Sequence, residues 1–149
     1  MSITQKAAKP DIHGLVQRVE LVGIQFLEVY GRLREGPQDE VDTDVKINVK
    51  ESHGPNAIEV RFRVLVEHTQ ASYAIEVGTR YTTEEPVDLE PSVLRDFIEK
   101  VAIMAAFPFI REGVATTAAK LEVEVPIMGI LRQGEFSLGE LAESVHASE

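Results

Sequence analysis

The sequence predicts an α+β fold, in which a four-stranded antiparallel sheet is followed by helices packed on one of its faces. In the first half of the chain, four segments carry apolar residues at every second position, and short turns join the later ones. In the second half, apolar residues recur three and four positions apart, which is typical of helices. Because the strands come before the helices and do not alternate with them, the class is α+β.

The first strand is expected within "VQRVELVGIQFLEV", residues 16–29, where Val22, Ile24 and Phe26 share one face. Residues 30–42 follow, and they contain two glycines and a proline. This composition predicts a long excursion of the chain and not a tight hairpin turn.

Three further strands are expected at residues 43–50, 57–69 and 72–82. The segment "TDVKINVK" alternates valine and isoleucine with charged or polar residues, so it predicts a half-buried strand with one wet face. The segment "AIEVRFRVLVEHT" has the strongest alternation in the chain, and "SYAIEVGTRYT" repeats the pattern. The stretch "ESHGPN" has the residues of a turn.

Two helices are expected after "EEPVDLEPSV", whose acids and prolines favour a helix start. A proline inside a helix loses a hydrogen bond and crowds the carbonyl group four residues before it, whereas a proline in the first turn is tolerated. The sequence therefore predicts a break or sharp kink at "AAFP" and a second helix that begins at Pro108.

Small residues are dense along both predicted helices, notably between Ala102 and Ala119. Small side chains let a helix approach its neighbours closely on more than one side. Two interpretations remain open here: a tight core within one chain, and an interface between subunits.

The size of the chain favours one domain. With 149 residues, 44% of them apolar, it is long enough for one core and short for two. We expect a polar N-terminal arm at residues 1–15 and a single domain at 16–149. No stretch resembles a signal peptide, and no run of about 18 apolar residues predicts membrane insertion, so we expect a cytoplasmic protein.

Composition and motifs argue against several functions. The net charge of -10 repels nucleic acid, and the absence of cysteine excludes disulfide bonds and thiol chemistry. The four histidines lack the spacing of metal ligands, and no nucleophile motif or phosphate-binding loop occurs. We therefore expect no catalytic residues, no metal site, no cofactor and no enzymatic activity.

The segment "VEVPIMGILRQGEF", residues 123–136, is apolar but contains a proline and two glycines. These residues disfavour a regular strand or helix. An irregular apolar segment is expected to lie over the core as a strap or to form one wall of a groove. Met128 and Met104 are adaptable side chains of the kind found on promiscuous surfaces, although core filling explains a single methionine equally well.

The stretch "FPFIRE" resembles "L-F-P-Y-A-R-E", the best-kept stretch of the SecB export chaperones. The matching residues are Phe107, Pro108, Phe109, Arg111 and Glu112, and we expect this motif to have a structural role. The four predicted strands resemble the four strands of that family in the same order, so the resemblance covers roughly residues 16–131.

The resemblance implies a homotetramer, a dimer of dimers, with its helices sandwiched between two sheets. It also implies a holdase without nucleotide or metal, which keeps unfolded polypeptides from aggregating until they are translocated or handed over. Many weak contacts along an extended client give strong total binding. By position, the resemblance places the walls of the client groove at Leu27, Val29, Tyr30, Leu33, Phe97, Val101, Met104, Ile127, Met128, Ile130 and Leu131.

The sequence also departs from the family pattern. The family docks the SecA motor on acidic side chains of its sheet; Glu76 matches one of them, whereas Gly23 and Leu27 stand at two other positions. The sequence therefore does not decide whether SecA is a partner. Only a short helix candidate follows Leu131, with Ser137 and Glu140 in capping-box spacing, so a lid over the groove is expected to be short or open.

Two questions stay open from the sequence: which client the chain binds, and to which class its function belongs. Divergent members of the family serve one dedicated client, the antitoxin of a toxin–antitoxin pair, and the sequence does not choose between this role and general export. A different class of function is a binding or assembly subunit that uses the same framework for a small apolar ligand or one folded partner. A fixed ligand favours a closed pocket with a few polar groups, whereas a chaperone favours an open groove.

Overall fold

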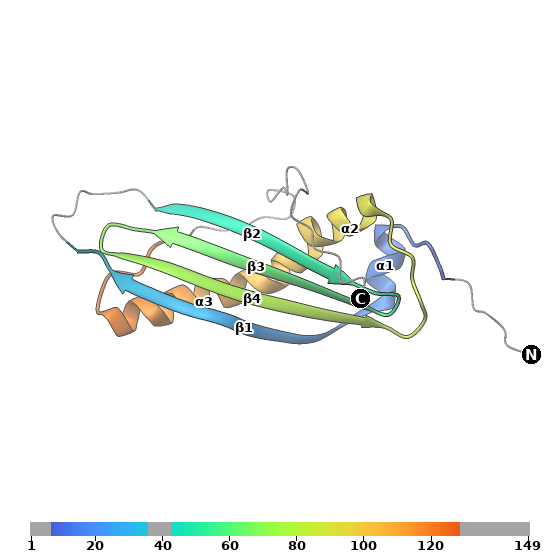
Figure 1. Cartoon of the computed structure of the whole chain (residues 1–149), viewed down its shortest axis with the longest axis horizontal. Coiled ribbons are helices and arrows are strands. Elements are labelled where there is room, and N and C mark those ends of the chain that lie inside the picture. The colour runs from blue at the N-terminus through green and yellow to red at the C-terminus, as the bar shows by residue number, and fades with distance from the viewer. Residues whose placement is uncertain (1–6, 36–42, 129–149) are drawn as a thin grey trace, which may run out of the picture.

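The structure, a computed structural model, describes residues 7–35 and 43–128. Along the chain it contains α1 (Ile12–Arg18), β1 (Val19–Leu33), β2 (Asp44–His53), β3 (Ala57–Glu67), β4 (Ala71–Thr83), α2 (Pro91–Phe97), the π-helical turn η1 (Ile98–Ala102) and α3 (Ile103–Leu121). The strands form one antiparallel sheet in the order β1-β4-β3-β2, and α2 and α3 cross behind it in the view of Figure 1. The predicted α+β class is confirmed.

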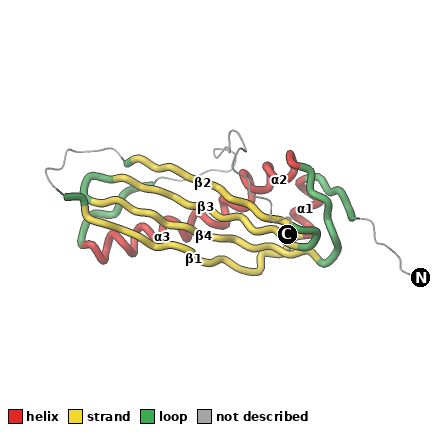
Figure 2. The backbone as a smooth tube through the Cα atoms, viewed as in Figure 1, coloured by secondary structure: helices red, strands yellow, loops and turns green. Residues whose placement is uncertain are grey.

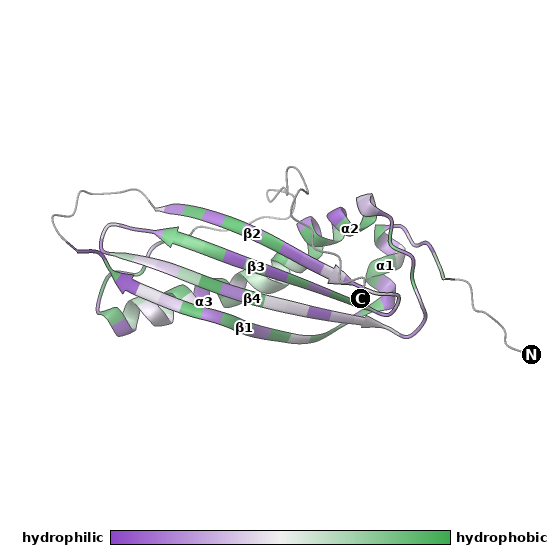
Figure 3. Cartoon of the chain, in the orientation of Figure 1, coloured by the Kyte–Doolittle hydropathy of each residue, from purple (hydrophilic) through white to green (hydrophobic). Residues whose placement is uncertain are grey.

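The inner face of the sheet, which meets the helices, is the centre of the core. Alternate residues of β3 point to this face and are at most 2% exposed: Ile58, Val60, Phe62, Val64 and Val66. Figure 3 shows the matching alternation of hydrophobic and hydrophilic residues along the strands. The alternation that predicted these strands is therefore the alternation between the core and the outer face.

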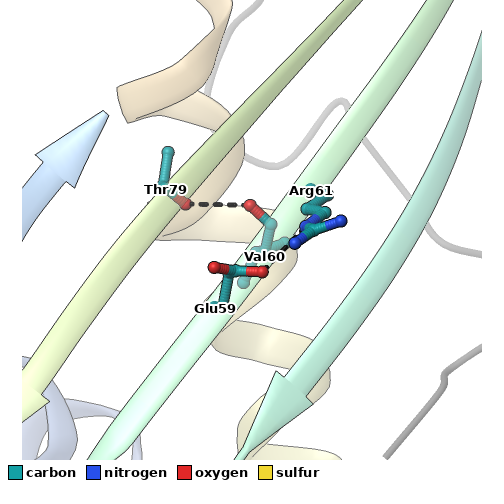
Figure 4. Close-up of polar contacts among 4 residues, drawn as sticks. All are labelled: Glu59, Val60, Arg61 and Thr79. Atoms are coloured by element: carbon teal, nitrogen blue, oxygen red, sulfur yellow. Dashed lines mark hydrogen bonds and ion pairs between the residues drawn. The ribbon is translucent and has the colours of Figure 1, made fainter. Parts of the chain in front are cut away.

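One polar side chain on the inner face is Thr79 of β4, which is fully buried. Its hydroxyl donates to the carbonyl oxygen of Val60 at 3.4 Å, as Figure 4 shows. On the outer face beside it, Arg61 donates from Nε to Glu59 Oε1 at 2.7 Å. Buried polar groups need such partners, whereas the outer face can leave its charges in water.

Strand β1 is longer than the sequence predicts. It starts at Val19 and not at Val16, and it continues to Leu33 through the first part of the predicted excursion, so that prediction is wrong for residues 30–33. The register with β4 shifts after Leu21 and again after Phe26. The first shift moves Val22 out of the inner row, and its side chain is 53% exposed. Bulges of this kind end a strict two-residue period.

The N-terminal region also differs from the expected polar arm. Helix α1 spans Ile12–Arg18, so the expected boundary between residues 15 and 16 falls inside it. The N–H of Gly14 donates to Asp11 Oδ1 at 2.8 Å, which caps the helix. Leu15 is fully buried and fixes the helix to the core.

Helix α3 is continuous through Pro108, so the predicted break at this residue is wrong. Ile103, Ile110 and Val114 are buried on one face of the helix, before and after the proline. The exposed Pro108 lies away from that face, and the burial of the apolar stripe offsets the lost hydrogen bond. The departure from α-helical geometry lies upstream, in η1, where the N–H of Ile103 bonds to the carbonyl of Ile98.

Small residues bring α3 close to its own sheet. A Cβ atom added at Gly113 would lie 3.1 Å from side-chain atoms of Phe26 and Ile75. Ala106 and Ala118 are fully buried under the same sheet. Figure 2 shows the helices lying behind the strands. Part of the small-residue pattern therefore belongs to the core of one chain.

Candidate functional site

The end of α3 sets the direction of residues 123–128, which we call the strap. Glu122 adopts a left-handed conformation with φ of 58°. The N–H of Val123 then donates to the carbonyl oxygen of Ala118 at 3.1 Å. The N–H of Glu122 donates to the carbonyl oxygen of Ala119 at 3.2 Å. These two bonds form a Schellman motif, which reverses the chain. Within the strap, Val123 and Met128 pack against the core.

A hollow of about 520 Å³ lies between α3 and the strap. Its walls are Pro108, Arg111, Glu112 and Ala115 of α3 and residues 125–128 of the strap. Ile127 stands 86% exposed at this hollow. The α3 residues recur at helical spacing, and Met104, which is 37% exposed, continues the same flank of the helix. We call this apolar surface the strap surface.

The opposite flank of α3 faces β1. The rings of Phe109 and Phe26 meet edge to face, with centroids 6.3 Å apart. Phe109 remains 40% exposed, and Leu21, Val29 and Leu33 on the inner side of β1 are 44%, 56% and 48% exposed. These residues form a second apolar surface along the edge of the sheet, which we call the β1 surface.

The outer face of the sheet carries paired charges. Arg63 Nε lies 2.9 Å from Glu28 Oε1 and 4.0 Å from Glu76 Oε1. The hydrogen bond and charge of Glu28 raise the pKa of Arg63 above its usual range, and the charge of Glu76 adds to this effect. Glu76 therefore shares a cation with a second carboxylate, and its charge is partly neutralised within the sheet.

The residues expected to line one groove lie on several surfaces. Leu27 projects over Gly78 on the outer face of the sheet, and Tyr30 points to the same face. Val29 and Leu33 belong to the β1 surface, which is on the other side of the sheet. All four lie in a strand and not in the expected excursion.

The expected groove residues of the helices and of the strap also lie in different places. Met104, Ile127 and Met128 lie at the strap surface, and Val101 is partly buried beside the core. Phe97 is fully buried, with its ring 4.8 Å from that of Tyr81, so it is a core residue and not a groove wall. Ile130 and Leu131, and the short helix candidate that follows them, lie outside the described residues.

The FPFIRE stretch contributes to both surfaces. Phe107 is 8% exposed and belongs to the core. Pro108, Arg111 and Glu112 face the strap, and Phe109 faces β1. Sequence reasoning gave this motif a structural role only, and it missed Phe109 and Leu21 as exposed apolar residues. Helical spacing alone could have separated Phe109 from Pro108, because adjacent helical residues point about 100° apart.

The described residues do not contain a group of three or more acids or histidines able to hold a metal ion. One buried acid, Glu51 of β2, lies 2.9 Å from the ring Nδ1 of His53. In the described ranges, none of the helices has the length and apolarity needed to cross a membrane. The prominent features of this part of the chain are thus its two apolar surfaces.

Comparison with known proteins identifies relatives of this chain. No protein-family model matches it. The "SecB-like chaperone SmegB" of Mycolicibacterium smegmatis (strain ATCC 700084 / mc(2)155) is 31% identical over 134 residues, which are 90% of each chain. Among solved structures, the Mycobacterium tuberculosis Rv1957 SecB-like chaperone, in complex with a ChAD peptide from the Rv1956 HigA1 antitoxin, has the same fold. The TM-score is 0.67 at 18% identity, over 79% of this chain and 91% of that chain.

Proposed function

This chain belongs to the SecB-like chaperones, and from that premise we propose that it is a holdase that binds unfolded polypeptides without ATP. The client is held by apolar contacts and protected from aggregation until it is translocated or handed over. Folded proteins have buried their apolar segments and are therefore not bound.

The exposure of large apolar side chains carries this proposal. Met104, Phe109, Val125 and Ile127 are between 37% and 86% exposed around α3. A single chain gains nothing from leaving such side chains in water, and contiguous apolar surfaces of this kind mark binding sites for other proteins. Chains with a net charge of -10 repel one another, which counteracts aggregation through these surfaces.

We place the client-binding site on the strap surface, around Met104, Ile127 and Met128. The hollow beside Pro108 and Ala115 accommodates apolar side chains of the client. Leu27 and Tyr30, on the outer face of the sheet, are not included.

Suppression of aggregation tests the function and the site together. A chemically unfolded enzyme is diluted into buffer with the chaperone, and light scattering is followed without nucleotide. The wild-type chain is expected to suppress scattering, and the double variant Met104→Asp, Ile127→Asp is expected to lose most of this effect. Leu27→Asp is the control, because Leu27 is 40% exposed but lies on the outer face of the sheet. If the wild-type chain does not reduce scattering, the result favours the alternative function, a binding or assembly subunit that holds a folded partner or a small ligand.

We propose that the working form is a homotetramer, a dimer of dimers. Two observations support self-association: β1 is a 15-residue edge strand without lysine, and its inner side carries the exposed apolar residues of the β1 surface. Edge strands that must stay unpaired are usually protected by lysine or by short length.

The identity of the client is a further part of the proposal. One related chaperone of known structure holds a peptide from an antitoxin, which supports a dedicated antitoxin-like client for this chain. Delivery to SecA through Glu76 has less support, because Glu76 lies 4.0 Å from the Arg63 cation, which it shares with Glu28. Pull-down with SecA and with an antitoxin segment distinguishes the two routes.

A further inference from the structure

The outer face of the sheet, which turns away from the helices, carries an excess of positive charge. Four rows of cross-strand partners form the middle of this face, and they begin at Lys46, Asn48, Lys50 and Ser52 of β2. These rows hold five of the 15 cations of the chain but only three of its 25 acids. The net charge of -10 is therefore reversed locally on this face.

Most of these cations have no carboxylate partner. The five are Lys46, Lys50, Arg61, Arg63 and Arg80. The two arginines of β3 each lie within 2.9 Å of a glutamate oxygen, and Figure 4 shows one of these pairs. Within residues 7–35 and 43–128, the other three cations form no ion pair. Their charges remain available to an acidic partner.

The register places two of the cations directly opposite each other. Lys50 of β2 is the partner of Arg61 of β3, and both side chains are exposed. Like charges in this position destabilise a sheet. The core does not require a cation at residue 50, because this side chain is on the outer face. Local features that lower stability in this way are expected at functional sites.

Two glycines lie beneath the arginines of the outer face. A Cβ atom at Gly23 of β1 would lie 2.9 Å from Nη2 of Arg80, so the guanidinium group lies directly over the backbone of β1. A Cβ atom at Gly78 of β4 would lie 3.7 Å from Cγ of Arg61 and 3.3 Å from Cδ1 of Leu27. Side chains that rest on the backbone in this way lose less conformational entropy when they bind. Leu27 adds an apolar contact beside the cations, since it is 40% exposed.

The spacing of these cations matches one side of a helix. Lys50 and Arg80 lie two strands and two residues apart, which corresponds to about 12 Å, and Arg61 lies between them. Helical residues at i, i+4 and i+7 share one side and span about 10 Å. A sheet face offers side chains and no free backbone groups, and helices are the elements that cover such faces in α+β domains.

We propose that this outer face docks the acidic side of a helix in a partner protein other than the client. Carboxylates at i, i+4 and i+7 of the helix meet Lys50, Arg61 and Arg80, and an apolar residue at i+3 meets Leu27. Nucleic acid does not fit, because the chain as a whole is acidic and repels a phosphate backbone. The strap surface is on the other side of the sheet, so the docking is independent of the holdase function.

A helical peptide tests the docking. The probe has about 16 residues, with glutamates at i, i+4 and i+7 and leucine at i+3, and a side-chain bridge on its opposite side keeps it helical. A fixed helix cannot add a strand to the sheet, so its binding reports on the face. Fluorescence anisotropy with the full chain, at about 0.15 M salt, should show binding about tenfold tighter than that of the same peptide with lysine in place of glutamate.

Removal of two cations locates the site. The double variant Lys50→Gln, Arg80→Gln should bind the glutamate peptide about tenfold more weakly than the wild-type chain. The control is Arg95→Gln, Lys120→Gln, which removes the same charge from exposed positions on α2 and α3 and should keep the affinity within about twofold. Circular dichroism should show that the first variant is folded, because Lys50→Gln removes the repulsion from Arg61.

The two surfaces should also respond separately. Leu27→Asp should weaken binding of the glutamate peptide about tenfold and leave the suppression of aggregation unchanged. The double variant Met104→Asp, Ile127→Asp should do the reverse.

Three results would overturn the docking and leave the holdase function standing. The first is equal affinity for the glutamate and lysine peptides, or no binding of the glutamate peptide. The second is an equal loss of affinity in the two glutamine double variants. The third is displacement of the peptide by a single-stranded oligonucleotide, since the face would then recognise phosphate groups.

Discussion

Single residues set how closely α3 lies on the sheet, and Gly31 is the clearest example. A Cβ atom at this position would collide with Cγ2 of Thr117 and approach Leu121. Gly31 is thus required for the contact between the end of α3 and β1, although in the sequence it looks like a loop residue. Its role was not predictable, because the collision involves a residue 86 positions away in the chain.

Replacement of this glycine should destabilise the fold. Gly31→Ala is expected to lower the free energy of unfolding by about 1 to 3 kcal/mol, because Thr117 and the helix must move to accommodate the methyl group. Urea denaturation measures this value. Gly54→Ala is the matched control, since a Cβ atom there meets no other atom within 4 Å. Similar losses in both variants would mean that the Gly31 contact is not specific.

The buried tyrosines predict a response to alkaline pH. Burial raises the pKa of Tyr73 above its ordinary value of 10.0, and burial also raises the pKa of Tyr81. Above pH 10 the unfolded chain loses these protons while the folded chain retains them, so stability should fall as the pH rises. At lower pH both states are protonated and the effect is absent.

Tyr73→Phe should reduce this alkaline loss. The hydroxyl of Tyr73 is buried and has no hydrogen-bond partner in the described structure, so its removal should leave stability at pH 7 unchanged or raise it by up to about 1 kcal/mol. Thermal unfolding between pH 7 and 11 measures both effects. Tyr30→Phe is the control: Tyr30 is 46% exposed, so this change should alter neither the stability at pH 7 nor its fall at alkaline pH. A large loss of stability at pH 7 in Tyr73→Phe would contradict the absence of a partner for the Tyr73 hydroxyl.

At the scale of elements, the strand pattern of the sequence was sufficient for the sheet but not for its edges. β2, β3 and β4 were predicted because one wet face and one buried face produce a clean two-residue period. The predicted β1 began at Val16 instead of Val19 and ended at Val29 instead of Leu33, because two bulges interrupt its period and glycine occurs within it. Phe97 was assigned to a groove by its position in the family resemblance, which does not tell what covers the side chain in this chain.

The continuity of α3 gives a prediction at the same scale. Pro108→Ala restores a backbone donor inside a continuous helix and should raise the free energy of unfolding by about 1 to 3 kcal/mol. Pro91→Ala, at the first turn of α2, is the control and should change stability little, because a proline there interrupts no hydrogen bond. Equal effects of the two changes would indicate that the helix breaks at Pro108, as the sequence alone suggests.

At the scale of the whole molecule, the two apolar surfaces have different proposed roles. The β1 surface is proposed to meet a second copy of the chain, and the strap surface is proposed to bind the client. The sequence resemblance indicated the family and an open apolar surface, but the division into two surfaces depends on the register of β1 and on which side of α3 each residue lies.

A change at the β1 edge should separate assembly from folding. Val29→Lys places a charge at a residue that is 56% exposed on the β1 surface, so the single chain should still fold while the proposed tetramer dissociates. Val45→Lys is the matched change at the β2 edge and should leave the assembly intact. Mass determination by light scattering and circular dichroism on the same samples report both properties. If the Val29→Lys variant has the same mass as the wild-type assembly, β1 is not part of the interface.

Calorimetric titration with one polypeptide in two states tests the holdase function. The purified chain is titrated with a polypeptide that is held unfolded and with the same polypeptide folded, and the mass of the chaperone is measured on the same sample. We expect the tetramer to bind the unfolded form tightly without nucleotide and not to bind the folded form. Equal binding of both forms, or none of the unfolded form, would contradict the holdase function.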